Sequence, residues 1–154
     1  MSQHKATLSW KSDSETFLTG KYTRVHTWAF DGGAVVAASA SPSVVPAPYS
    51  SPAAIDPEEA FVASVSSCHM LTFLHEARKA GFRVDAYDDE AVGEMAKNER
   101  GVPWISKITL NPRIVYGGDK RPSPEDEGQL HHRAHDFCFI AQSIKTDVTV
   151  AGIG

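Results

Sequence analysis

The sequence predicts an α+β fold in which one domain spans residues 1–154. Three observations lead to this prediction. Residues 22–28 place alternate side chains on two faces, as a strand does, and a turn signal follows them. A long helical segment begins at Asp56 and carries clear signals at both ends. Further alternating stretches then surround a second helix start at Ser123.

The first 55 residues contain the opening strands. Residues 7–10 form a short strand candidate, and one face of the next strand carries alternate residues, Tyr22, Arg24, His26 and Trp28. The Asp-Gly-Gly run at 31–33 predicts a turn, so residues 34–38 return as the second arm of a hairpin. The segment 39–55 holds four prolines, and we expect it to cross the surface as a loop.

A helix of some 23 residues follows this loop. Asp56 is the expected N-cap, Pro57 takes the first helical position, and Glu59 completes a capping box three residues after the cap. Gly81 provides the C-terminal stop. Because apolar side chains are spread widely around this helix, we expect it to be buried on most sides: Phe61, Val62, Val65, Leu71, Phe73 and Leu74.

The remaining elements are shorter. Alternation predicts strands at 91–97 and 104–110, and residues 117–122 read as a loop. Ser123 and Pro124 begin a second helix in the same way as Asp56 and Pro57. Residues 145–150 form a closing strand. The predicted order is three strands, the long helix, two strands, a helix and one strand.

Composition narrows the class of protein. The net charge of -4 and the absence of a basic stripe argue against a nucleic-acid partner. No apolar run is long enough to span a membrane, and the N-terminus has no apolar signal core. We therefore expect a cytoplasmic protein whose thiols are kept reduced. A permanent disulfide between its two cysteines is not expected there, whereas a transient one is compatible.

Cys68 lies within the long helix and raises the first chemical question. The thiolate is the reactive form of cysteine, and apolar surroundings suppress it, so a reactive Cys68 needs a charged partner. His69 is adjacent but points about 100° away on a helix, which makes it a poor candidate. The residue alone leaves two interpretations open, a small buried hydrophobic residue or a reactive thiol.

A second cluster lies in the second helix. His131, His135 and Cys138 are spaced so that one helical face presents three soft ligands, as zinc sites require. The alternative is that these histidines lie on the helix surface or satisfy core carbonyls. A third interpretation joins Cys68 and Cys138 as an attacking and a resolving thiol, because separation along the chain does not prevent two helices from packing together.

Two stretches make the sequence recognisable. DPEEAFVASVSSCHMLTFL, which begins at Asp56, and AHDFCFIAQSIKTDVTV, residues 134–150, resemble the two signature blocks of the OsmC/Ohr family of osmotically inducible and organic hydroperoxide resistance proteins. Glu58 and Cys68 have the family's separation of ten residues. The resemblance implies an OsmC-like fold, in which antiparallel sheets wrap around long central helices in an intertwined homodimer.

The resemblance also implies a role for each matched residue. Cys68 would be the peroxidatic cysteine and Cys138 the resolving one, while Glu58 would orient an arginine near the thiolate. Arg24 matches that arginine best, and His26 on the same strand face could share or replace its role. The implied activity is thiol-dependent reduction of small organic hydroperoxides, with a lipoyl-type or other dithiol as reductant.

Two other functions remain open at this point. One is a metal-binding module that uses His131, His135 and Cys138, and the other is a non-enzymatic, ligand-binding dimeric stress protein. The sequence contains no nucleotide motif and no Gly-rich phosphate loop, so we expect no cofactor and no metal for the peroxidase.

Overall fold

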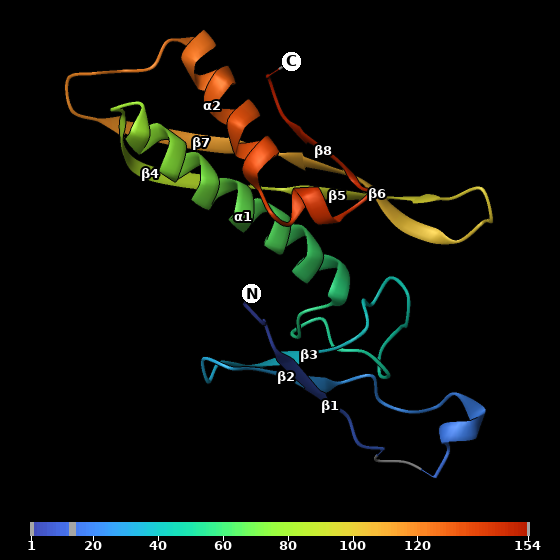
Figure 1. Cartoon of the computed structure of the whole chain (residues 1–154). Helices are drawn as coiled ribbons and strands as arrows, with labels where there is room; N and C mark the ends of the chain where they lie inside the picture. The colour runs from blue at the N-terminus through green and yellow to red at the C-terminus, as the bar shows by residue number, and fades with distance from the viewer. Residues whose placement is uncertain (1, 13–14, 154) are drawn as a thin grey trace. The chain divides into compact units, whose positions relative to one another are not determined.

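The computed structural model describes residues 2–12 and 15–153, which group into two compact units, Met1–Ala60 and Phe61–Gly154 (Figure 1). The first unit is built on a three-stranded antiparallel sheet in the order β1-β2-β3: β1 (Ala6–Ser9), β2 (His26–Phe30) and β3 (Val35–Ala38). Trp28 lies at the centre of this sheet, opposite Leu8 on one side and Val36 on the other. The predicted hairpin is therefore confirmed.

The strand β2 begins at His26, four residues later than the alternation suggested. The backbone N–H of Arg24 donates instead to the carbonyl of Tyr49, at 2.8 Å. The preceding residues are thus tied to the proline-rich loop rather than to the sheet. That loop contains no strand, as predicted, and joins β3 through a single bridge between Ala38 and Ile55.

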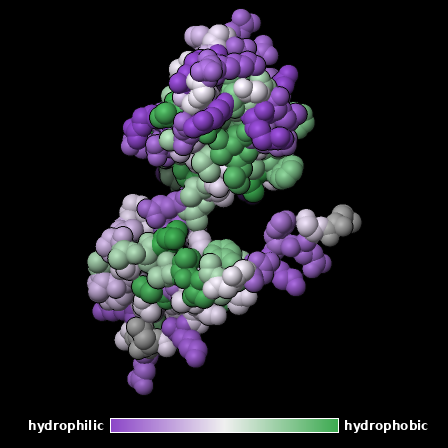
Figure 2. Space-filling view, turned by 90° about the vertical axis from the view of Figure 1, so that its left-hand side faces the viewer, coloured by the Kyte–Doolittle hydropathy of each residue, from purple (hydrophilic) through white to green (hydrophobic). Residues whose placement is uncertain are grey.

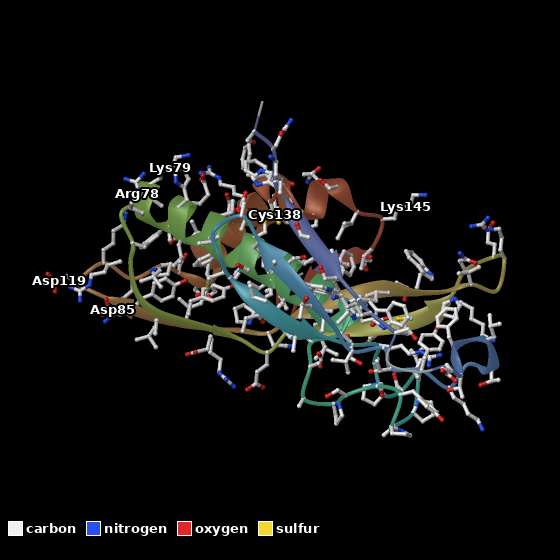
Figure 3. The ribbon with its side chains drawn as sticks, turned by 90° about the horizontal axis from the view of Figure 1, so that it is seen from below. Arg78, Lys79, Asp85, Asp119, Cys138 and Lys145 are labelled. Atoms are coloured by element: carbon white, nitrogen blue, oxygen red, sulfur yellow. The ribbon has the colours of Figure 1, made fainter. Side chains whose placement is uncertain are left out.

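The helix α1 (Pro57–Lys79) starts and ends where the sequence predicts. The Glu59 N–H donates to Asp56 Oδ1 at 2.7 Å, and the Asp56 N–H donates to Glu59 Oε2 at 3.1 Å, which completes the capping box. Gly81 takes the left-handed conformation after the last turn, with φ of 81°. Figure 3 shows Arg78 and Lys79 pointing outward from that turn.

The second unit combines α1 with two sheets and a second helix. In one sheet β4 (Arg83–Asp89) pairs with β7 (Pro112–Gly117). In the other, β6 (Pro103–Leu110) lies between β5 (Val92–Lys97), which is antiparallel to it, and β8 (Asp147–Val150), which is parallel. The helix α2 (Pro124–Phe137) begins with a capping box of Ser123 and Asp126. The α+β prediction is confirmed, while β4 and β7 are additional to the predicted strands.

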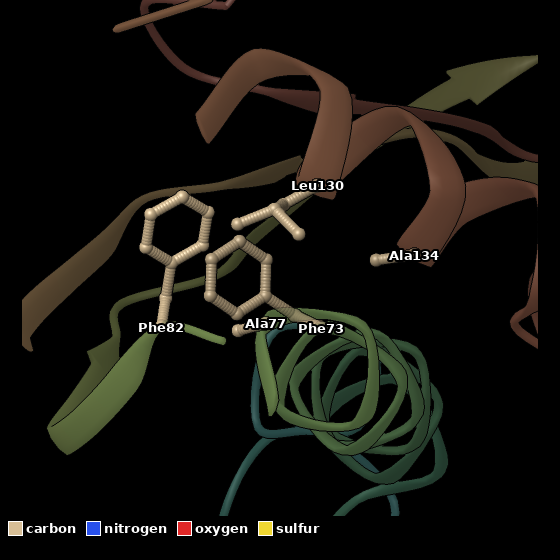
Figure 4. Packing of buried hydrophobic residues seen from close by; sticks show 5 residues of the cluster. All are labelled: Phe73, Ala77, Phe82, Leu130 and Ala134. Carbon is tan, nitrogen blue, oxygen red and sulfur yellow. The ribbon is translucent and has the colours of Figure 1, made fainter. Parts of the chain in front are cut away.

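The second unit has two groups of buried apolar side chains. One lies between α1 and α2, where Phe73 and Leu130 point toward each other (Figure 4), and consists of Phe73, Ala77, Phe82, Leu130 and Ala134. The other joins α1 to the β5-β6-β8 sheet and consists of Val65, Ile108 and Leu110. Both groups lie on one stripe of α1. On the other side Leu71 is 61% exposed, so within one chain the helix is buried on fewer sides than its composition indicates.

None of the helices in the described part of the chain has the length and apolarity needed to cross a bilayer.

Candidate active site

The two cysteines meet where α1 and α2 pack together. Cys68 lies at the start of the fourth turn of α1, beside the buried stripe that contains Val65 and His69, and its side chain is half-buried. Cys138 is the residue that caps the C-terminal end of α2, and Figure 3 shows it beside α1. The two free thiols interact with each other although they are 70 residues apart in the sequence. The fold therefore brings the predicted thiol pair together.

Cys138 occupies the more enclosed position. Its side chain is fully buried, and its Sγ accepts a hydrogen bond from the Ala141 N–H at 3.3 Å. Burial, followed by the interaction with the Cys68 thiol, raises the pKa of Cys138 to about 11. Cys138 is therefore protonated at neutral pH, as suits a thiol that reacts second.

A pair of histidines lies next to the thiols. Nε2 of His69 and Nδ1 of His131 are 2.9 Å apart, and the two ring planes are nearly parallel, with 10° between them and 5.3 Å between the ring centroids. Burial is the main reason why the pKa of each imidazole is lowered to about 4. For His69 a smaller lowering comes from His135, while Asp89 acts in the opposite direction. Both rings are thus neutral at pH 7.

Asp89, at the end of β4, connects this region of α1 to the strands. Its Oδ2 accepts a hydrogen bond from the Ser66 hydroxyl, and its Oδ1 accepts one from the Asn111 N–H at 2.7 Å. One carboxylate therefore holds together α1, β4 and the start of β7. This contact fixes the turn of α1 that immediately precedes Cys68.

His131, whose spacing from His135 and Cys138 suggested a zinc site, contacts the other helix instead. Nδ1 of His131 is engaged with His69, from the other helix, rather than turned toward His135 and Cys138. Within residues 2–12 and 15–153, no three His, Cys, Asp or Glu side chains are placed to hold a metal ion. The contact between His69 and His131 is not among the features predicted from the sequence. The sequence did contain a signal that each ring is buried, since each lies on the apolar stripe of its helix, but none that the two rings meet.

Arg24 lies in a pocket of the first unit. Its Nη1 donates to the carbonyls of Gly20 at 3.0 Å and Tyr22 at 2.5 Å, and its guanidinium stacks 3.6 Å above the Tyr22 ring. The pocket has a volume of about 550 Å³, and its walls are mostly apolar, with Leu8, Trp10 and Phe17 among them. A fixed cation beside apolar walls suits a ligand that has both an apolar body and a polar, electron-rich end.

His26 lines the same pocket but has both ring nitrogens occupied. Nδ1 lies 2.8 Å from the carbonyl oxygen of Arg24, which can only accept, so Nδ1 carries the proton. Nε2 then accepts a hydrogen bond from Trp28 Nε1, also at 2.8 Å. A neutral ring held in this way has neither a positive charge nor a free lone pair. Of the two sequence candidates, Arg24 is the better suited to stabilise a thiolate.

Glu58 is in the first turn of α1, at the positive end of the helix dipole. Its Oε2 atom is buried, and none of the described residues donates a hydrogen bond to it. A buried carboxylate oxygen needs a donor, and a guanidinium satisfies it best because it forms two charge-assisted hydrogen bonds.

Comparisons with known proteins agree on one family. The family profile described as OsmC-like protein matches residues 50–151. An OsmC-like protein of unknown function from Vibrio cholerae has a solved structure that is 49% identical to this chain. The comparison covers 97% of this chain and 98% of that one, with a TM-score of 0.94. A comparison with curated proteins found no match.

More distant solved structures share the fold. An organic hydroperoxide resistance protein from Elizabethkingia anophelis is 17% identical over 97% of this chain and 96% of its own, with a TM-score of 0.70. The organic hydroperoxide resistance protein OhrB of Bacillus subtilis is 20% identical over 96% of each chain, with a TM-score of 0.66. The predicted OsmC-like fold is therefore confirmed.

Proposed function

Because the chain belongs to the family of OsmC-like proteins, we propose that it is a thiol-dependent peroxidase that reduces organic hydroperoxides in the cytoplasm. The observation that carries this proposal is the meeting of its only two cysteines, Cys68 and Cys138, between two helices. A half-exposed thiol beside a buried, protonated one is the arrangement that a two-thiol peroxidase needs.

The reaction has three steps. The Cys68 thiolate attacks the terminal peroxide oxygen, the O–O bond breaks, and the alkoxide leaves as an alcohol after taking up a proton. Cys68 is then a sulfenic acid. The Cys138 sulfur bonds to the Cys68 sulfur, and the hydroxyl leaves as water with the Cys138 proton. An external dithiol, of lipoyl or similar type, reduces the resulting disulfide and becomes a disulfide itself.

Arg24 is assigned as the cation that stabilises the thiolate and the leaving alkoxide. A guanidinium donates charge-assisted hydrogen bonds to the thiolate sulfur and to the alkoxide oxygen, and it remains charged at any relevant pH. The apolar walls around it fit the organic part of a hydroperoxide. Glu58, with its buried and unsatisfied Oε2, is assigned to orient that guanidinium.

The position of Glu58 leads to the proposal of a homodimer. Glu58 and Cys68 are ten residues apart on one helix, hence about 15 Å along its axis, which a glutamate side chain cannot span. Glu58 would therefore serve the Cys68 site of a second copy. Exposed apolar residues support such an assembly, and Figure 2 shows hydrophobic surface on both units. On the second unit they include Leu71, Val92, Phe137 and Phe139.

The test counts thiols before and after one equivalent of cumene hydroperoxide is added to the reduced protein. The wild type should lose two thiols and release one equivalent of alcohol. Cys68→Ser should keep its remaining thiol and consume no peroxide. Peroxide consumption by Cys68→Ser at the wild-type rate would refute the proposed function.

A further inference from the structure

Besides the thiol pair, two polar contacts of different character join α1 and α2. One is the hydrogen bond between His69 and His131, whose side chains are 1% and 2% exposed. The other is the ion pair of Arg133 with Glu76, 3.5 Å long, in which the arginine side chain is 56% exposed and the glutamate side chain 6% exposed. Both partners of the histidine contact are thus enclosed in the interface, whereas the ion pair joins a buried glutamate to an exposed arginine.

The contacts between α1 and α2 show that the two helices run in opposite directions. At one end Ala77 and Leu130 belong to the same buried group, and at the other end Cys68 meets Cys138. The histidine pair lies between them. His69 directly follows Cys68, so the contact that fixes His69 also fixes the turn that carries the attacking thiol.

A buried polar pair specifies how two helices are aligned. If α2 moved along α1 by one residue, about 1.5 Å, the two ring nitrogens would separate inside the interface. Each unpaired buried polar group costs about 1–3 kcal/mol, whereas apolar contacts tolerate such a shift more easily. A disulfide is sensitive to the same shift because its Cα atoms must be about 4.4–6.8 Å apart.

We propose that the hydrogen-bonded His69–His131 pair holds α1 and α2 in the alignment that lets Cys138 reach Cys68, which makes both histidines positioning residues for disulfide formation. This inference deepens the proposed function and rests on it. The pair touches neither peroxide nor leaving group, and it acts by keeping the effective concentration of one thiol at the other high. The neutrality of both rings at pH 7 keeps one nitrogen as donor and the other as acceptor.

The test uses variants that remove or retain this hydrogen bond. His131→Phe keeps a ring against Phe73 but has no nitrogen for His69. The double variant His69→Gln/His131→Asn keeps polar atoms where Nε2 of His69 and Nδ1 of His131 lie. It also removes Nε2 of His131, which is buried and has no hydrogen-bond partner among the described residues. Arg133→Gln is the matched control, because it weakens the other contact between the same helices.

Three quantities are measured for each protein at pH 7.5. They are the equilibrium constant for disulfide formation in glutathione buffers, the rate of disulfide closure after one equivalent of cumene hydroperoxide, and the rate of Cys68 alkylation by iodoacetamide. In glutathione buffers the protein's two thiols are oxidised and one oxidised glutathione becomes two reduced ones, so no peroxide enters this measurement.

For His131→Phe we expect the equilibrium constant and the closure rate to fall by about tenfold or more, the equivalent of one lost buried hydrogen bond. Alkylation of Cys68 should stay within about twofold of the wild type, because the thiol itself is untouched. Arg133→Gln and the Gln/Asn double variant should stay within about threefold in all three quantities, since both keep a polar contact in the buried interface. If His131→Phe does not fold, His69→Met removes the same hydrogen bond from α1 and takes its place.

An unchanged equilibrium constant in His131→Phe or His69→Met would overturn the inference. So would an equal fall in Arg133→Gln, which would indicate a general loosening of the helices, or a wild type that forms no Cys68–Cys138 disulfide in these buffers. Failure of the proposed function would give a different pattern of results. In that case the wild type does not consume hydroperoxide, while the glutathione equilibrium still depends on the histidine pair.

Discussion

A Cβ atom on Gly93 of β5 would lie 2.6 Å from Cγ2 of Val62 on α1. The strand and the helix therefore approach as closely as a glycine permits. Gly93→Ala should force the two elements apart and lower the free energy of unfolding by about 1–3 kcal/mol, the usual cost of overpacking. Urea unfolding followed by circular dichroism measures this change.

Two further variants show whether the loss of stability comes from the contact between Gly93 and Val62. Val62→Ala in the Gly93→Ala background removes the opposing methyl groups and should recover part of the lost stability. Gly32→Ala is the control, since a Cβ there would meet nothing within 4 Å. A Gly93→Ala protein as stable as the wild type would show that β5 and α1 separate easily.

Acid should destabilise the protein through the histidine pair. In the unfolded chain a histidine has a pKa of about 6.5. In the folded chain, burial lowers the pKa of His69 and His131 to about 4. Between these values the unfolded chain binds protons that the folded chain does not. The free energy of unfolding should therefore fall as the pH drops from about 6.5 to about 4, by at most about 3 kcal/mol per histidine.

Urea unfolding at pH 7.5, 6, 5 and 4.5 measures this dependence. Carboxylates also titrate in this range, so the informative quantity is the difference between the wild type and His69→Gln/His131→Asn. The double variant should show the shallower loss of stability on acidification. Parallel curves for the two proteins would mean that the histidines are not buried as a neutral pair.

The two thiols should differ in reactivity. With a pKa of about 11, Cys138 is ionised to about one part in a thousand at pH 8. Iodoacetamide at that pH should label Cys68 of the reduced, folded protein and leave Cys138 unlabelled, whereas both should react in urea. Peptide mass spectrometry distinguishes the two sites. Faster labelling of Cys138 than of Cys68 would reverse their assigned roles.

Replacing Arg24 should affect the thiolate. Arg24→Met removes the assigned cation and should slow both peroxide consumption and Cys68 alkylation at pH 6, while Arg24→Lys should retain part of each rate. His26→Phe is the comparison, because that ring is held neutral between Arg24 and Trp28. A larger effect from His26→Phe than from Arg24→Met would assign the role to the histidine.

A mixed dimer tests whether Glu58 acts across subunits. Glu58→Ala chains and Cys68→Ser chains are co-expressed with different tags, and the mixed dimer is purified through both. If Glu58 serves the other subunit's site, one site has both defects and the other has none. By that symmetry the mixed dimer should have about half of the wild-type activity.

Other outcomes would contradict the assignment of Glu58. A mixed dimer without activity would mean that Glu58 acts within its own chain, since every site would then have one defect. Full activity in Glu58→Ala alone would limit the residue to stabilising the start of α1.

The sequence predicts those features that depend on residues close to one another along the chain. Asp56, Glu59 and Gly81 define both ends of α1 because capping involves residues three or four apart. The strand β4 is harder to recognise because a bulge between Val84 and Ala86 breaks its alternation. The partner strand β7 contains Pro112 and Arg113 in only six residues, which weakens its pattern.

The candidate site likewise contains residues that the sequence predicts and a contact that it does not. Cys68 and Cys138 were identified through two local blocks of sequence, which the fold then brings together. The pairing of His69 with His131 could not be predicted, because it joins residues 62 apart and depends on how α2 packs on α1. Spacing within α2 alone suggested that His131 faces His135 and Cys138, and only the tertiary structure shows that its Nδ1 faces the other helix.

The β4-β7 sheet has only two strands, so β4 pairs on one side and leaves the backbone of its other edge open within the described chain. An open edge can recruit a strand from another molecule and begin aggregation. The sequence of β4 opposes this because it carries exposed charges at Arg83, Asp85 and Asp88. Arg83 and Asp85 form an ion pair on this edge, and pairing with another strand would remove water from these charges. That cost would help to keep the protein dispersed at high concentration, and replacing Asp85 and Asp88 by asparagine should increase aggregation.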